Sequence, residues 1–295
     1  MTWLVWLNVR YDKMAKLVTK SLLLLFFLLA SASSFVIPDE EPEQFMIGGT
    51  PTVQGAFPAV AFIRTIGRPI CGAAVIDERH VVTLAQCVLN GTFHLYNPRL
   101  VRVHTGDIML NPVSPTRETR LASVIYVHPN FKAHTYENDI AVIRLQEPLP
   151  LPSNEIEPAF RRTRIVGNGF TCHMVGWGQT AAAGQVVDVQ QRSIPTVIND
   201  RDQCNFVRHL SPVTESMICA GNLVAAATGP APCTGNIGSG LYCDGDLTGL
   251  LSFGLNCGTA NNPPTFTQIR FFNGWIEQQL VRTDVPPAGW SPLDV

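Results

Sequence analysis

The residue type most able to take part in chemistry is cysteine, and the eight cysteines all lie between positions 71 and 257. Thiols either pair as disulfides or bind metal ions, and an even number suits complete pairing. Spacing alone leaves many pairings possible. Disulfides persist in oxidising compartments, so their assignment depends on whether the chain is secreted.

Two other residue types could also carry chemistry. The seven histidines lack the HxH and HxxxH spacing of metal sites, so we predict no metal and no cofactor. Asn90-Gly91-Thr92 is the one sequon for N-linked glycosylation, and it follows Cys87 in a polar segment. We therefore expect Asn90 to carry a glycan in a secreted chain.

The N-terminus has the layout of a secretory signal peptide. Lys13, Lys16 and Lys20 precede the apolar run LLLLFFLLA at 22–30, and small residues allow cleavage after Ala32. We predict a signal peptide over residues 1–32, with a possible start at Met14, and a secreted, extracellular protein. A membrane anchor remains the alternative, because residues 21–37 carry no charge but are marginal in length for a bilayer span.

Composition indicates a large folded core and excludes one class of partner. Hydrophobic residues make up 46% of the chain and charged residues 15%, which suits a globular protein. A formal net charge of -2 argues against nucleic acid binding, because phosphate recognition needs a cationic surface. The 23 glycines and 22 prolines favour many turns over long helices.

Short apolar runs separated by turn residues predict strands, since many of them are rich in Val and Ile. The expected strands cover 59–64, 73–76, 80–84, 100–104, 140–145, 171–175, 249–253 and 265–269. Their spacing favours a sandwich or barrel over alternating strands and helices. One helix is predicted over 271–280, where Phe271, Phe272, Trp275, Ile276 and Leu280 share a face.

The order of the motifs resembles that of chymotrypsin- and trypsin-type serine proteases. MIGGTPTVQGAFPAVAFI at 46–63 resembles the start of the mature family domain, and CGAAVIDERHVVTLAQC at 71–87 resembles its C-G-G-S-L-I to A-A-H-C segment. The motifs ENDIAVIRL, VGWGQT, MICAG, CTGNIGSGLYC, LSFGLNC, PPTFTQI and WIEQQL follow in the family's order. The resemblance covers residues 46–281, with an acidic arm at 33–45 and a proline-rich tail at 282–295.

The resemblance implies an all-β fold of two six-stranded antiparallel β-barrels, with a cleft between them and a C-terminal α-helix. It also implies four disulfides, which use every cysteine: Cys71–Cys87, Cys172–Cys243, Cys204–Cys219 and Cys233–Cys257. Each would stabilise the fold by about 2–4 kcal/mol by restricting the unfolded chain.

The family's Ser-His-Asp catalytic triad falls at Ile237, Gln86 and Asp139, so that only the aspartate is kept. Triad chemistry needs a nucleophilic hydroxyl and a base that takes its proton. Ile237 has no nucleophilic atom, and the Gln86 carboxamide has no useful basicity near neutral pH. The sequence therefore predicts an inactive homologue that is not an enzyme. We expect Gln86, backbone N–H groups and Ser252 to satisfy the buried Asp139.

The activation and pocket positions also depart from the family pattern. Phe45, and not a basic residue, precedes the domain start, and Asn236 replaces the aspartate that pairs with a new N-terminus. We therefore expect an uncleaved chain. The pocket remnants are Ala231 at the base, Pro264 on the wall, and the strand edge Ser252, Phe253 and Gly254, to which an extended peptide could add.

The predicted function is that of a secreted, non-catalytic serine protease homologue which binds an extracellular protein. It would act as a cofactor or decoy in protease cascades, in immunity, or in reproductive or salivary fluid. We expect a monomer that binds no nucleic acid and no membrane beyond its signal peptide. Two alternatives stay open: an active serine-type endopeptidase with an unrecognised mechanism, and a membrane-anchored adhesion protein.

Overall fold

The computed structural model describes residues 49–66, 68, 70–151, 153–177, 190–207, 212–221, 223, 237–254, 263–286 and 291. The predicted signal peptide and acidic arm lie outside these residues. So do Ala231, Asn236 and both members of the predicted Cys233–Cys257 pair.

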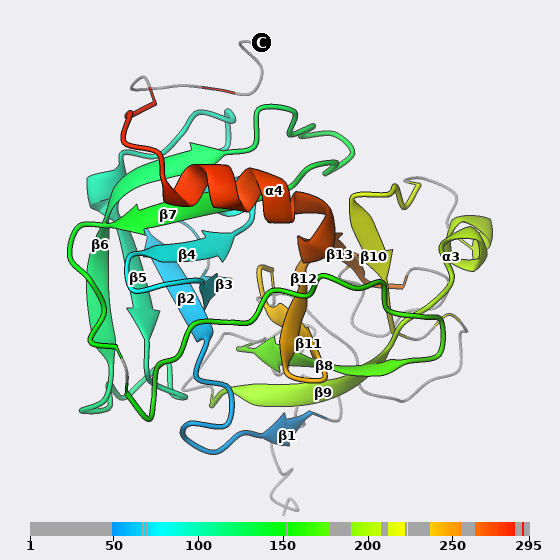
Figure 1. Ribbon diagram of the computed structural model, residues 1–295, viewed down its shortest axis with the longest axis horizontal. Helices are drawn as coiled ribbons and strands as arrows, with labels where there is room; N and C mark the ends of the chain where they lie inside the picture. The colour runs from blue at the N-terminus through cyan, green and yellow to red at the C-terminus, as the bar shows by residue number, and fades with distance from the viewer. Residues whose placement is uncertain are drawn as a thin grey trace, which may run out of the picture. The chain divides into compact units, whose positions relative to one another are not determined.

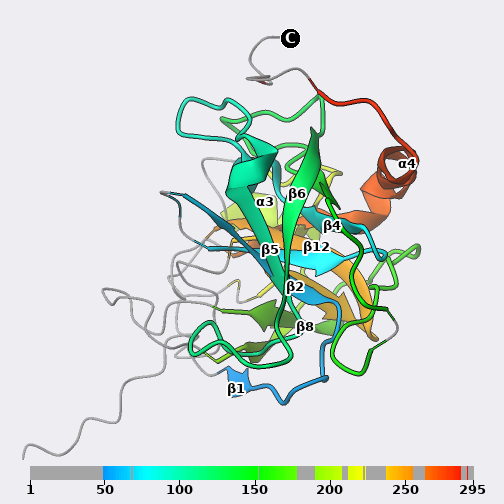
Figure 2. The same cartoon turned by 90° about the vertical axis from the view of Figure 1, so that its left-hand side faces the viewer.

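Six antiparallel strands form a closed barrel in the first half of the described chain (Figure 1). They are β2 (Val60–Thr65), β3 (Cys71–Val75), β4 (His80–Thr83), β7 (Ala141–Leu145), β6 (Glu118–Val127) and β5 (Val101–Thr105), in this spatial order. Figure 2 shows this barrel with β5 and β6 toward the viewer. The first predicted barrel is therefore confirmed.

Seven strands form the second sheet, and an isolated bridge between Ile198 and Ala220 links the residue after β9 to the residue after β10. Their order is β1 (Thr50–Pro51), β9 (Arg192–Val197), β8 (Thr171–Gly176), β11 (Gly240–Cys243), β12 (Asp246–Phe253), β13 (Thr265–Gln268) and β10 (Met217–Cys219). Gly221 N donates to Val197 O at 2.7 Å beside that bridge. The sheet thus curls back on itself, and β1 is an additional strand at the start of β9.

The eight predicted strand regions all fall on observed strands, although six of them extend one residue beyond the strand, at residues 59, 76, 84, 100, 140 and 269. Five observed strands, β1, β6, β9, β10 and β11, had no predicted counterpart, and for β6 and β9 the reason can be identified. The first half of β6 carries Glu118 and Arg120 among its apolar residues, and β9 contains Pro195, which usually argues against a strand.

The helices are short except for the last one. They are α2 (Ala85–Val88), α3 (Arg201–Val207) and α4 (Ile269–Leu280), with a 3-10 turn η1 (Pro98–Leu100). The predicted apolar face of α4 is right for Phe272 and Ile276, which are buried, but wrong for Phe271, which is 49% exposed. In the part of the chain that the structure describes, no helix is both long and apolar enough to cross a bilayer.

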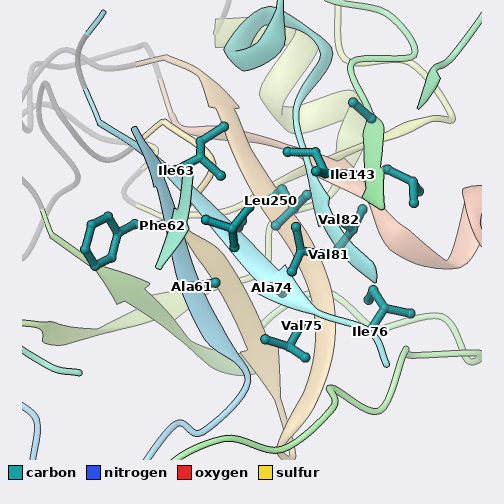
Figure 3. Packing of buried hydrophobic residues seen from close by; sticks show 14 of the residues in the cluster. Ala61, Phe62, Ile63, Ala74, Val75, Ile76, Val81, Val82, Ile143 and Leu250 are labelled. Carbon is teal, nitrogen blue, oxygen red and sulfur yellow. The ribbon is translucent and has the colours of Figure 1, made fainter. Parts of the chain in front are cut away.

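The strand β12 supplies side chains to two separate apolar clusters. Leu250 belongs to the cluster that fills the first barrel, where Figure 3 shows it with Ile63, Val81 and Ile143. Its neighbour Leu251 belongs to the cluster inside the second sheet. Successive side chains of a strand point to opposite faces, so β12 packs both halves of the molecule at once.

Three of the four predicted disulfides are confirmed. Cys71–Cys87 links β3 to α2, Cys172–Cys243 links β8 to β11, and Cys204–Cys219 links α3 to β10. The first of these bridges fixes the short helix that follows β4 against the barrel.

A close main-chain contact joins β3 to the segment that carries Ile237. Gly72 N donates to Ile237 O at 2.7 Å. A Cβ added at Gly72 would lie 2.5 Å from backbone atoms of Gly238 and Ser239, closer than real Cβ atoms come to other atoms. Only glycine at position 72 allows the two backbones to meet.

We predict that Gly72→Ala lowers the free energy of unfolding by about 3 kcal/mol, because the added methyl group forces the two backbones apart. Gly274→Ala is the matched control, since nothing lies within 4 Å of a Cβ at this position of α4. The control should gain up to about 1 kcal/mol from helix propensity. Urea unfolding of both variants measures the difference, and an unchanged stability for Gly72→Ala would contradict the contact.

Candidate functional site

The pairing of β4 with β7 brings Gln86 and Asp139 together. Thr83 lies opposite Ala141, so the residues just after β4 and just before β7 meet at one end of the barrel. Gln86 Nε2 lies 2.5 Å from Asp139 Oδ2, and the backbone N–H of Gln86 donates to Asp139 Oδ1 at 3.0 Å. The glutamine thus binds both oxygens of the carboxylate.

Ser252 of β12 completes this cluster from the other half of the molecule. Its hydroxyl donates to Asp139 Oδ2 at 2.6 Å, and its carbonyl oxygen accepts from Gln86 Nε2 at 3.0 Å. The predicted satisfaction of Asp139 by Gln86, a backbone N–H and Ser252 is confirmed by these contacts. The Gln86 amide therefore bridges the first barrel and the second sheet.

The Asp139 carboxyl group has no exposed surface. Burial raises its pKa to about 6, although the hydrogen bonds from Ser252 and Gln86 favour the charged form and oppose this rise. The Asp139 carboxyl group therefore binds a proton more tightly in the folded state than in the unfolded state. The contribution of Asp139 to stability falls as the pH rises from about 4 through 6.

Main-chain bonds hold the segment of Ile237 between β3 and β12. Besides the Gly72 contact, Gly238 N donates to Leu251 O at 2.8 Å, and Leu251 N donates to Ser239 O at 2.9 Å. The Ile237 side chain is partly buried and packs against the apolar cluster of the first barrel. The Ser239 side chain is buried and lies against Gly176 of β8.

The predicted pocket remnants within the described residues lie together at the end of β12. Phe253 stacks on Tyr136, with ring centroids 5.5 Å apart and planes at 26°. Gly254 has a φ of +92°, and a Cβ there would lie 3.0 Å from Pro264 Cα. Pro264 also lies close to Gly221, because a Cβ added at Gly221 would be 3.1 Å from the Cδ atom of Pro264. The proline ring thus occupies the space between two glycines.

Sequence reasoning missed Tyr136 as a member of this site. Its φ is +56°, and the φ of Asn138 is +58°. The loop before Asp139 therefore contains two left-handed backbone conformations, which residues other than glycine rarely adopt. This turn carries the Tyr136 ring over Phe253. The asparagine at 138 is the one local signal, because asparagine tolerates the left-handed region better than most residues.

The remaining candidate residues lie elsewhere. His80 Nδ1 is 2.9 Å from both carboxylate oxygens of Asp77 in the turn before β4, and not beside Asp139. Asn90 Oδ1 accepts from Thr92 N at 2.9 Å and from Thr92 Oγ1 at 2.8 Å in an exposed turn. No three His, Cys, Asp or Glu side chains gather within the described ranges in a way that could hold a metal ion.

Comparisons with known proteins agree on one family. The family profile described as Trypsin matches residues 46–276. Serine protease 1 of Rattus norvegicus is 28% identical over 261 residues, which cover 88% of this chain and 98% of the relative. Trypsin of Sus scrofa is 26% identical, with 80% and 95% covered, and Trypsin-2 of Salmo salar is 28% identical, with 72% and 86% covered.

These relatives contradict the prediction that the chain is not an enzyme. Each of them is named a trypsin or a serine protease, and the match extends over most of both chains. The prediction rested on the residue types at positions 86 and 237, whereas the relatives that match over most of both chains are named as proteases.

We predict that Gln86→Ala destabilises the fold by about 1–3 kcal/mol at pH 8, because it leaves the Asp139 carboxylate and the Ser252 carbonyl short of a donor. Losing a donor to the charged form raises the Asp139 pKa further. The loss of stability should therefore be smaller at pH 4, where the carboxyl group is protonated.

Urea unfolding at the two pH values measures this effect. Gln278→Ala, at an exposed glutamine of α4, is the control and should change stability by less than about 0.5 kcal/mol at either pH. Equal losses for Gln86→Ala at pH 4 and pH 8 would show that its bond to Asp139 does not depend on the charge.

Proposed function

The chain belongs to the trypsin family, and from this premise we propose that it is a secreted protein whose trypsin-like serine protease domain binds another extracellular protein. The observation that carries the proposal is the Gln86 amide, which bonds Asp139 and the Ser252 carbonyl at 2.5 and 3.0 Å. These polar groups hold the two halves of the molecule in one arrangement. A rigid frame of this kind presents its surface loops in fixed positions for recognition.

Surface features support a binding role. Phe206 and Phe160 are 85% and 80% exposed, and aromatic side chains are enriched where proteins bind one another. Three disulfides brace the frame, which supports secretion because such bonds persist in oxidising compartments. We propose that the protein acts as a monomer, as a cofactor or decoy for proteins of extracellular protease cascades.

Proteolysis is a second candidate function, because the relatives named above are trypsins and serine proteases. On this candidate Asp139 is the one family triad residue available, and the nucleophile must come from a group other than the Ile237 side chain. The candidate predicts turnover of peptide or ester substrates that copurifies with the chain and is lost in Asp139→Ala.

We predict that the immobilised full chain retains one protein from its native extracellular fluid, with a Kd of roughly 1 µM or tighter. The purified partner should form a one-to-one complex with the chain in calorimetry. Mass spectrometry of the partner after incubation then separates the two candidates. Recovery at full mass supports binding, whereas cleavage at defined peptide bonds supports proteolysis and contradicts our first proposal.

We predict a glycan at Asn90 when the protein is made in secretory cells, because its sequon lies in an exposed turn. Removal of N-glycans should lower the mass of the secreted protein, and Thr92→Ala should abolish this change. Gly91→Ala is the matched control, since nothing lies within 4 Å of a Cβ there and the sequon is kept. An unmodified protein retained inside the cells would contradict the secretion proposal.

A further inference from the structure

Two arginines lie directly opposite each other on the outside of the first barrel. Arg64 of β2 pairs in register with Arg102 of β5, and these strands are neighbours in the barrel (Figure 2). Ile63 and Val103, which adjoin them on the two strands, are buried in the core of the barrel. Because successive side chains of a strand point to opposite faces, the two arginine side chains point away from that core.

The positive charges of these two arginines are not compensated within the described part of the chain. No ion pair there includes either arginine. Arg64 Nη2 donates to the neutral carbonyl oxygen of Leu110 at 3.2 Å, and Arg102 is exposed. The buried Asp107 is already engaged by Arg117 at 2.8 Å and by two backbone N–H groups. Like charges at directly opposite strand positions are unfavourable, so a bound anion would stabilise this pair.

The His104 ring lies beside this positive charge. It comes two residues after Arg102 on β5 and stacks on Phe62, with ring centroids 4.8 Å apart. The guanidinium groups of Arg64 and Arg117 lie 5.5 and 5.3 Å from the centroid of the Phe62 ring. Burial, followed by the charges of these three arginines, lowers the pKa of His104 to about 4. The ring is therefore neutral near pH 7, and the surplus charge of this surface is that of the two unpaired arginines.

Two exposed apolar side chains extend the same surface toward the end of the strands. Ile66 follows β2 and is 72% exposed, and Leu100 precedes β5 and is 44% exposed. Each comes two residues from an arginine, which is a separation of about 6.6 Å along an extended chain. We call Arg64, Arg102, Ile66 and Leu100 the arginine face. It presents a cationic pair beside an apolar pair at this spacing.

We propose that the arginine face binds an extended acidic segment of a partner protein, in which a glutamate or aspartate lies two positions from a large apolar residue. Side chains two positions apart in an extended peptide point the same way and lie about 6.6 Å apart, which matches the spacing of the two pairs. One carboxylate accepts hydrogen bonds from both guanidinium groups, and the apolar side chain packs on Ile66 and Leu100.

The apolar pair favours a peptide over a sulfated polysaccharide. Both would be attracted by Arg64 and Arg102, but a polysaccharide has no apolar side chain to cover Ile66 and Leu100. The inference rests on the proposed binding function in taking a protein as the partner.

The first test titrates the full-length secreted protein with the peptide acetyl-Leu-Thr-Glu-Thr-Leu-amide and follows its 15N NMR spectrum. We expect a Kd on the order of 1 mM, with shifts concentrated in residues 62–66 and 100–104. The control peptide acetyl-Leu-Glu-Thr-Thr-Leu-amide has the same composition, but its glutamate is an odd number of positions from each leucine. It should bind at least about fivefold more weakly, because its acidic and apolar side chains point to opposite sides of an extended chain.

Two matched pairs of exposed-site variants locate the peptide. Arg102→Gln should weaken binding at least about fivefold, whereas Arg164→Gln, at an exposed arginine outside the arginine face, should leave it unchanged. Ile66→Ser should also weaken binding. Ile165→Ser removes a side chain that is equally exposed, at 73%, but lies outside the arginine face, and should have no effect.

Absence of binding at about 10 mM peptide, equal binding of the two peptides, or equal binding by all four variants would overturn the inference. So would a face that binds heparin but neither peptide, with heparin binding lost in Arg102→Gln and kept in Ile66→Ser, because the ligand would then be a sulfated polysaccharide.

The partner experiment fails or succeeds separately from this one. A native partner that is retained equally by Arg102→Gln and Arg164→Gln would place its contact elsewhere, which overturns the inference and leaves the binding function intact. Specific peptide binding by a chain that retains no partner from its native fluid would contradict the proposed function and support the arginine face as a peptide site.

Discussion

A buried carboxylate requires hydrogen bonds to replace those that water would supply. Asp139 is fully buried, so both halves of the molecule must place hydrogen-bond donors around it. Its donors come from α2 in the first barrel and from Ser252 in the second sheet, so neither half can satisfy it alone. The Cys71–Cys87 disulfide holds α2 in place beside the barrel. The position of Gln86 and the approach of Ser252 in β12 both serve this carboxylate.

The backbone around Ile237 is fixed by a different constraint. Its carbonyl oxygen and the N–H of Gly238 are both used in main-chain hydrogen bonds, and Gly72 leaves no room for the segment to move closer to β3. The conformation at this position therefore depends on glycines and on strand pairing more than on the side chain at 237. This explains how a trypsin-like arrangement of the backbone accommodates an aliphatic residue whose side chain packs on the barrel core.

Sequence reasoning succeeded where a residue type has one dominant physical consequence. The Val- and Ile-rich runs became strands, and the chemical need of Asp139 identified its partners. It failed where tertiary context decides, as for Pro195 inside β9, for Phe271 on the exposed side of α4, and for the left-handed turn that carries Tyr136 over Phe253. The prediction that the chain is not an enzyme is contradicted for another reason, because it gave two substituted positions more weight than the match to relatives that are named proteases. Arg64 and Arg102 are far apart in the sequence, so no local pattern could reveal that they lie opposite each other.

The strand β12 couples the unfolding of the two halves of the molecule. Leu250 and Leu251 are consecutive residues, yet one is sealed in the barrel core and the other in the core of the second sheet. Withdrawing β12 from either core exposes apolar surface in both. The two halves each have their own sheet, but β12 couples their cores, and we therefore expect them to unfold together in one transition.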